Sequence, residues 1–251
     1  MTKYLVVSDV HGYIDPLERV LTNADLYQEI WFLGDVIGHD AMVSADSFLR
    51  CYSLLYKFRD KIRCVIGNWE YWILNPQKDK DENSPQYIYR EYLQARREEL
   101  KNAGLYTWIA EWPEKIDRDE FAYIHGSPSA FRDPTFHTTE TYILPQNGKY
   151  VSTIFLNKMI NRPHLLFAHT HQPGYFRVNC VSDPQFNTLQ RRDLDKPFDY
   201  EGKGFKIHYA INPGSISQNR KIYLDNELVD PGRTALVIDT EKKTFTFIEV
   251  K

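Results

Sequence analysis

The 251-residue sequence has few cysteines, no long apolar run and little net charge, and each shortage excludes some classes of protein. Its three cysteines, Cys51, Cys64 and Cys180, are scattered and odd in number, so buried thiols are expected and a disulfide framework is not. No apolar stretch reaches the roughly 18 residues that suggest a transmembrane helix. The first apolar segment follows residues 1–3 directly, so we expect no signal peptide and predict a cytoplasmic protein.

The charge balance, 31 basic against 34 acidic residues for a net charge of −3, argues against a long nucleic acid as partner. It remains compatible with a small phosphorylated substrate held by metals. The chain is long enough to bury a sizeable core. We expect one domain over residues 1–251, with insertions near 75–103, 127–150 and 173–204, and the sequence does not indicate an oligomeric state.

Three apolar segments, residues 4–8, 29–33 and 61–66, predict strands, and residues 14–21 and 42–58 between them have helical periodicity. Alternating strands and helices predict a parallel sheet with right-handed crossovers. Further strands are expected at 165–168, 205–211, 235–239 and 244–250, and a hairpin near residues 115–124. Residues 129–150 are interpreted as a long loop over the site, and residues 173–204 as irregular.

Polar side chains follow five of these predicted strands, often beside a glycine that lets the backbone turn tightly. The strand ends carry Asp9 and His11, Asp35, Asn68, His125, and His169 with His171. Asp9 and His11 alone could be a helix cap and a loop histidine, and Asn68 could cap a helix. Five strand ends that all present Asp, Asn or His are hard to explain by packing, so we interpret the set as metal ligands.

Seven donors suit a site for two metal ions, which repel each other unless an anion lies between them. Asp35, flanked by glycines, is the expected bridge. A water held between the cations is the expected nucleophile, with its pKa lowered far below that of bulk water. Mixed nitrogen and oxygen donors favour Mn, Fe or Zn over Mg or Ca, and we favour Mn or Fe.

The motifs Asp9-Val-His11, Gly34-Asp35-Val-Ile-Gly38, Gly67-Asn68-Trp69-Glu70, His125-Gly126 and His169-Thr-His171 resemble those of the calcineurin-like metallophosphoesterase superfamily. The resemblance implies an α/β fold, a four-layer αββα sandwich of two mixed sheets flanked by helices, with a dinuclear metal site at the strand ends. It implies that Asp9, His11, Asp35 and His171 hold one metal, and that Asp35, Asn68, His125 and His169 hold the other. Asp35 and Asn68 are therefore also candidate catalytic residues.

One position departs from the family pattern, because Trp69 stands where the family usually has a histidine that protonates the leaving group. An indole cannot transfer a proton near neutral pH. The Gly-Asn-Trp-Glu form is similar to small bacterial members assigned as asymmetric diadenosine tetraphosphate hydrolases. A phosphoanhydride leaving group is already acidic, so we hypothesise that the change favours anhydrides over alkyl monoesters. Trp69 could stack on an adenine base or pack at a helix start.

Three further residues have candidate roles. His39 could replace the missing proton donor, although a role in the site is the minority interpretation. Arg132 could bind phosphate, and a solvated surface arginine is an equally good interpretation. Glu70 is expected to orient a ligand without binding the metal itself.

The sequence thus predicts a metal-dependent hydrolase of phosphoanhydride or phosphodiester bonds, with a nucleotide, specifically a dinucleoside polyphosphate such as diadenosine tetraphosphate, as the favoured substrate. One alternative is a serine/threonine-type protein phosphatase or a nucleotide phosphodiesterase. A less favoured one is a metal-dependent nucleotide-binding module that has lost catalysis with the histidine.

Overall fold

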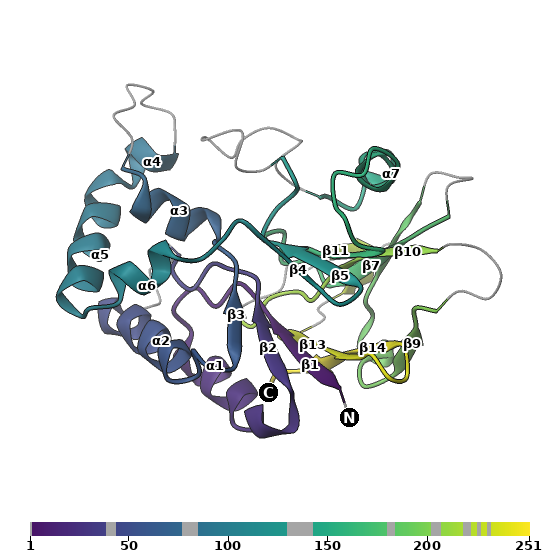
Figure 1. Cartoon of the computed structure of the whole chain (residues 1–251), viewed down its shortest axis with the longest axis horizontal. Coiled ribbons are helices and arrows are strands. Elements are labelled where there is room, and N and C mark those ends of the chain that lie inside the picture. The colour runs from purple at the N-terminus through teal and green to yellow at the C-terminus, as the bar shows by residue number, and fades with distance from the viewer. Residues whose placement is uncertain are drawn as a thin grey trace.

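Two six-stranded sheets lie face to face at the centre of the molecule, with helices on both outer faces (Figure 1). The structure, a computed structural model, describes residues 2–38, 44–76, 85–129, 143–179, 184–201, 207–217, 222–224, 227–229 and 232–251. Among these residues no helix is long and apolar enough to cross a bilayer.

The first sheet has the order β3-β2-β1-β13-β14-β9. Its strands are β1 (Lys3–Val7), β2 (Glu29–Phe32), β3 (Ile62–Cys64), β9 (Pro197–Asp199), β13 (Thr234–Asp239) and β14 (Thr244–Glu249). Strands β1, β2 and β3 run parallel, as the alternation of strands and helices predicts, and β13 joins β1 antiparallel. The carboxyl ends of β1, β2 and β3 therefore lie at one edge.

The second sheet has the order β4-β5-β6-β10-β7-β8. Its strands are β4 (Lys115–Arg118), β5 (Phe121–Ile124), β6 (His164–Leu166), β7 (Gly174–Val178), β8 (Phe186–Thr188) and β10 (His208–Asn212). Strands β5, β6 and β10 are parallel neighbours, so their carboxyl ends also share an edge. A separate pair, β11 (Ile222–Leu224) and β12 (Glu227–Val229), completes the strands of the described chain.

The helices divide between the two outer faces. Those that pack on the first sheet are α1 (Ile14–Leu21), α2 (Ala45–Lys57), α3 (Asn68–Leu74), α5 (Arg90–Asn102) and α6 (Tyr106–Ala110). Helix α7 (Gly148–Leu156) packs on the second sheet, and α4 (Pro85–Ile88) precedes α5. Within the described segments, short 3-10 turns occupy Ala24–Leu26 and Arg191–Asp193.

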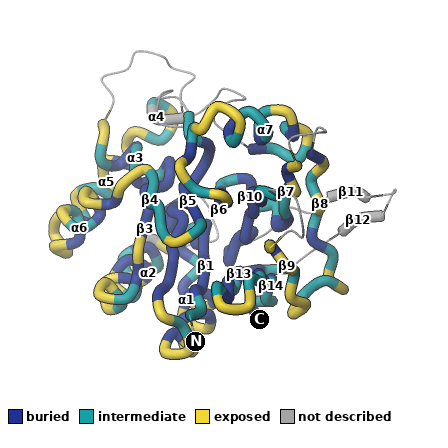
Figure 2. Tube along the Cα trace, turned by 45° about the vertical axis from the view of Figure 1, so that its right-hand side comes forward, coloured by how far each residue is buried: buried dark blue, intermediate teal, exposed yellow. Residues whose placement is uncertain are grey.

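Strand β1 shows why the layers form, because its side chains alternate between two apolar cores. Leu5 and Val7 join the core between the first sheet and its helices. Tyr4 and Val6 join the core between the two sheets, and a third core lies between the second sheet and α7. The buried residues follow these central strands through the molecule (Figure 2). The predicted fold class, a four-layer αββα sandwich of two mixed sheets, is confirmed.

Two expectations for the segments between the strands need correction. Residues 173–204, predicted to be irregular, contain β7, β8 and β9, so that prediction is wrong. Strands β8 and β9 have three residues each, and β9 begins with Pro197, which a strand accepts at its first residue or at a sheet edge. The loop predicted over residues 129–150 is too long at its end, because α7 begins at Gly148; residues 130–142 lie outside the described chain.

Candidate metal centre

The chain turns sharply at the strand ends that carry the candidate ligands. Asp9 and His11 follow β1, Asp35 follows β2, and His169 and His171 follow β6, and all five have positive φ, between 46° and 72°. Residues other than glycine adopt this left-handed conformation rarely, and it persists where the surroundings impose it. The first two turns support each other: the Asp9 amide donates to the carbonyl of Gly34 at 3.0 Å.

Asp9, His11 and His171 form one cluster. The Nε2 atoms of the two histidines lie 3.0 Å apart, and Asp9 Oδ1 is 3.2 Å from His171 Nε2 and 3.8 Å from His11 Nε2. The Asp9 carboxylate is fully buried. Its other oxygen accepts the amide of His169 at 3.3 Å, which fixes the orientation of the carboxylate.

Asp35, His125 and His169 form the second cluster, and Asn68 adjoins it. His125 Nε2 is 3.1 Å from Asp35 Oδ2, 3.0 Å from Asn68 Oδ1 and 3.0 Å from His169 Nδ1. Asn68 is the first residue of α3. All four side chains come from different turns that follow strands, and His125, Asp35 and Asn68 are buried.

Asp35 lies between the two clusters. Its Oδ2 is 3.1 Å from His125 Nε2 in the second cluster and 4.0 Å from His11 Nε2 in the first. Its Oδ1 accepts the backbone amide of Trp69 at 3.1 Å. A carboxylate held in this position is the group that a pair of cations needs between them.

Backbone carbonyls set the protonation of two histidines. The Nδ1 atom of His11 is 2.9 Å from the carbonyl oxygen of Ile37, and Nδ1 of His125 is 2.6 Å from that of Leu33. Because a carbonyl oxygen only accepts, each Nδ1 carries a hydrogen, and Nε2 is therefore the nitrogen of each ring that can bind a metal. His125 Nε2 faces the acceptor atoms of Asp35 and Asn68, an arrangement that a proton or a cation at this position stabilises.

A buried oxygen gives an independent test of whether the residues fit metal ions. Within the described chain, Asp9 Oδ1 is buried and accepts no hydrogen bond, although its cluster mates lie within 4 Å. A buried carboxylate oxygen without a donor is destabilising unless a cation or proton compensates it. The donor types of both clusters, imidazole nitrogen and carboxylate or amide oxygen, fit divalent transition metals.

The pKa values of the metal-free site reflect the same crowding. Burial by itself lowers the pKa of His125, but the Asp35 carboxylate and its hydrogen bond raise that pKa to about 9. Burial and the neighbouring His125 lower the pKa of His169 to about 3. Burial opposes ionisation of Asp9, yet the facing His171 and His125 hold the pKa of this carboxyl well below its usual range. One proton on His125 thus occupies the space that suits a cation.

Glu70 holds the Asp35 turn and does not reach either cluster. Its fully buried carboxylate accepts the amides of Asp35 and Val36, each at 2.9 Å, and that of Gly67 at 3.1 Å. The Tyr52 hydroxyl also donates to it, at 2.8 Å. The expectation that Glu70 orients a ligand agrees with these contacts. Tyr52 has no sequence signal, because only packing brings α2 against this turn.

The turn after β10 supports the site from the other sheet. Ser215 Oγ donates to the carbonyl of Asp9 at 2.8 Å, and Asn212 Nδ2 donates to Thr170 Oγ1 at 2.9 Å. Thr170 stands between His169 and His171. Asn212 and Ser215 therefore fix the turns that carry the candidate ligands of both clusters.

The remaining candidate residues separate into two groups. The Trp69 ring packs against Trp72 and Tyr89, with ring centroids 5.2 Å and 5.3 Å apart, and its backbone amide contacts Asp35. The structure therefore gives this indole packing partners. His39 and Arg132 lie outside the described residues.

The fold and the paired clusters are those of a phosphoesterase. The profile of the calcineurin-like phosphoesterase family matches residues 2–210, so the chain belongs to this family. Membership implies a phosphoester hydrolase that acts on small phosphorylated substrates. Comparison with curated proteins gave no significant match.

Solved structures share the fold. A metallophosphoesterase from Sphaerobacter thermophilus is 25% identical, with a TM-score of 0.71, over 100% of this chain and 88% of that chain. A hypothetical protein from Pyrococcus horikoshii OT3 is 16% identical, with a TM-score of 0.64 and the same coverage. A cold-active protein-tyrosine phosphatase from a psychrophilic Shewanella species is 15% identical, with a TM-score of 0.50, over 99% of this chain and 81% of that chain.

Proposed function

We propose that the protein is a dinuclear metal-dependent hydrolase of phosphoanhydride or phosphodiester bonds, with dinucleoside polyphosphates such as diadenosine tetraphosphate as substrates. The observation that carries the proposal is the position of Asp35 Oδ2 between two clusters of inward-facing donor atoms. Asp9, His11, Asp35 and His171 would hold one ion, and Asp35, Asn68, His125 and His169 the other.

Manganese or iron fits the mixed nitrogen and oxygen donors best. The bound ions would supply activated water and positive charge for the phosphoryl oxygens. The protein contributes the geometry: carbonyl contacts at Nδ1 orient the rings of His11 and His125 so that their Nε2 atoms face inward. Asn68 Oδ1 lies beside His125 and could hold a metal, and the Nδ2 of the same amide could donate to a phosphoryl oxygen.

Trp69 supports the preference for an acidic leaving group. The indole cannot donate a proton, and its packing against Trp72 and Tyr89 holds it at the start of α3. A nucleotide or polyphosphate leaving group departs without protonation more readily than an alkoxide. A further contact of Trp69 with a nucleobase, and a role for His39 as proton donor or Arg132 as phosphate ligand, remain parts of the proposal.

A substrate panel tests the proposal. Purified protein loaded with Mn²⁺ or Fe²⁺ is incubated with diadenosine tetraphosphate, bis-p-nitrophenyl phosphate and a phosphopeptide. We expect the tetraphosphate to give ATP and AMP, and Asp35→Asn to reduce both turnover and bound metal. Cleavage of the phosphopeptide alone would establish a protein phosphatase. If none of the three substrates is turned over, the proposal that the protein is a hydrolase is refuted.

A further inference from the structure

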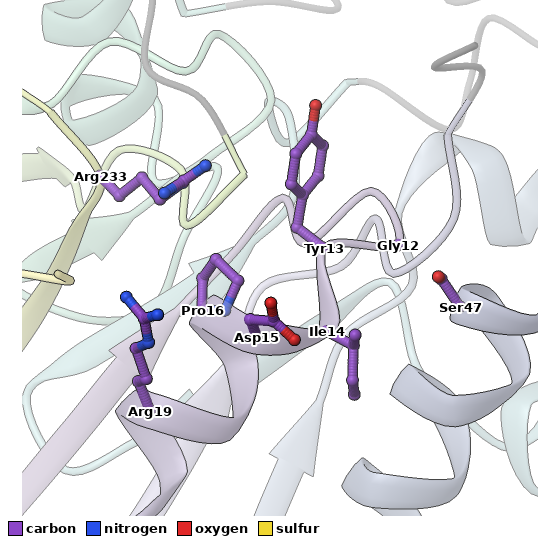
Figure 3. A pocket seen from close by; sticks show the side chains of 8 residues that line it. All are labelled: Gly12, Tyr13, Ile14, Asp15, Pro16, Arg19, Ser47 and Arg233. Atoms are coloured by element: carbon purple, nitrogen blue, oxygen red, sulfur yellow. The ribbon is translucent and has the colours of Figure 1, made fainter. Parts of the chain in front are cut away.

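An open pocket of about 240 Å³ begins at the residue that follows the candidate ligand His11 (Figure 3). Gly12 and Tyr13 form one side of it, the start of α1 forms its floor, and Ser47 on α2 and Arg233 before β13 complete the lining. Since one water takes up about 30 Å³ of liquid, the pocket has room for a phosphate group with its hydration.

Two guanidinium groups from distant parts of the chain line this pocket, Arg19 from α1 and Arg233 from the turn before β13. Among the described lining residues, Asp15 is the one acidic residue, so with the two arginines their formal charge is +1. An acidic residue in the first turn of a helix is favourable there without any ligand. In Figure 3 both arginines lie on one side of Tyr13 and Pro16, and Asp15 lies between them and Ser47.

Arg233 is held in position by the protein. Its Nε donates to the carbonyl of Ser217 at 2.8 Å, and its guanidinium lies 5.8 Å from the centre of the Tyr13 ring. Among the described residues, its two Nη atoms have no protein acceptor, so they can bind an anion in two-pronged fashion. The amide of Ser217 donates to the carbonyl of Asp9 at 3.3 Å, so the same segment contacts the arginine and a candidate metal ligand.

We propose that this pocket is a phosphate subsite in which Arg19 and Arg233 bind the part of a polyphosphate substrate that lies next to the reacting phosphorus. The inference rests on the proposed function, because it extends the same site. It explains how a chain with a net charge of −3 could hold a highly anionic substrate: the positive charge is local. A substrate with one phosphate would reach the metal centre without filling the pocket.

Binding of methylenediphosphonate, whose P–C–P bond is not hydrolysed, tests the subsite without catalysis. Calorimetry on the metal-loaded full chain compares it with inorganic phosphate. We expect the diphosphonate to bind at least tenfold more tightly, and Arg19→Gln or Arg233→Gln each to reduce that advantage about tenfold, as loss of one charge-assisted hydrogen bond does. Arg19 is exposed on a helix, so its variant will fold even if that of Arg233 does not.

Arg59→Gln is the matched control. Like Arg233, Arg59 donates to a backbone carbonyl, that of Tyr56 at 3.3 Å, and its guanidinium lies over a tyrosine ring, 4.7 Å from the centre of the Tyr56 ring. It does not line the pocket beside Tyr13. Its variant should bind both anions as the wild type does. Equal binding of the diphosphonate by wild type and both pocket variants would overturn the subsite.

Turnover separates the subsite from the proposed function. In Arg19→Gln and Arg233→Gln, the ratio of kcat/KM for diadenosine tetraphosphate to that for bis-p-nitrophenyl phosphate should fall at least tenfold, and in Arg59→Gln it should not change. A wild-type chain that binds the diphosphonate through the arginines but hydrolyses nothing would refute the function and retain the subsite. If the wild type hydrolyses diadenosine tetraphosphate and the ratio of the two kcat/KM values is unchanged in the pocket variants, the subsite is refuted and the proposed function is retained.

Discussion

Replacing Glu70 by glutamine should remove the support of the Asp35 turn while preserving its volume. Within the described part of the chain, this buried carboxylate accepts hydrogen bonds from the amides of Asp35, Val36, Ile37 and Gly67 and from the Tyr52 hydroxyl. Burial and the nearby Asp35 carboxylate raise the pKa of Glu70, and the hydrogen bonds from Tyr52 and the Asp35 amide oppose that rise because they favour the ionised form. In the glutamine variant, the side-chain NH2 group would replace one carboxylate oxygen, and its hydrogens would point at the hydrogens of the donors that this oxygen had accepted.

The magnitude follows from the number of bonds that the substitution breaks. Each oxygen of Glu70 accepts at least two of these donors, so Glu70→Gln loses at least two hydrogen bonds to a charged group. At about 1.5–3 kcal/mol each, the free energy of unfolding should fall by about 3–6 kcal/mol. Tyr52→Phe removes one such bond and should lower it by about 2 kcal/mol.

Urea denaturation at pH 7 measures these changes, and calorimetric titration with Mn²⁺ measures whether metal affinity falls with them. Glu98→Gln is the matched control, because Glu98 is exposed on α5 and pairs only with Lys101 among the described residues. Its effect should stay within about 0.5 kcal/mol. A loss below about 1 kcal/mol in Glu70→Gln would show that the carboxylate does not hold the turn.

Three further substitutions, His164→Asn, Trp69→His and Gly67→Ala, should each change stability or substrate preference in a direction that the structure determines. Burial, His208 and Lys243 lower the pKa of His164 to about 3, so the unfolded state, with a pKa of about 6.5, binds more protons between these values; stability is complete above pH 6.5 and falls toward pH 3. From pH 7 to pH 5 the wild type should lose about 2 kcal/mol more than His164→Asn in denaturant titrations, and parallel losses would contradict this. Trp69→His should raise the ratio of alkyl monoester to anhydride turnover at least about tenfold, and an unchanged ratio would remove the proposed reason for the tryptophan. Gly67→Ala would place its Cβ against the Asp35 amide and should cost at least about 2 kcal/mol in thermal unfolding, against about 1 kcal/mol for Gly104→Ala, where nothing lies within 4 Å; equal losses would count against the close approach.

The strands that carry the site could be predicted because their signals are local. The helix expected over residues 14–21 is α1, and the hairpin around Arg118 and Asp119 is β4 and β5. Strands β8 and β9 escaped prediction because three residues at a sheet edge carry little periodic pattern, and β7 lies between β10 and β8, which stabilise it as a strand. The predicted single domain over residues 1–251 stays a prediction.

The candidate ligands could be named from the sequence because each follows an apolar strand, and parallel strands bring their carboxyl ends to one edge. The sequence could not show which histidine nitrogen faces inward, because that depends on the carbonyls of Leu33 and Ile37. The sequence also gave no sign of the pocket beside Tyr13, because its two arginines, Arg19 and Arg233, are 214 positions apart along the chain.

Local order along the chain, meaning strand, tight turn and polar side chain, indicated the candidate metal ligands from the sequence alone, and the resemblance of these motifs to a family indicated the class of chemistry. The tertiary structure decided which atoms meet: Asp35 Oδ2 between the clusters, Tyr52 on Glu70, and Arg233 beside Tyr13. The physical reason is that backbone periodicity is encoded by neighbours in sequence. Contacts between side chains from separate elements depend on how whole sheets and helices pack.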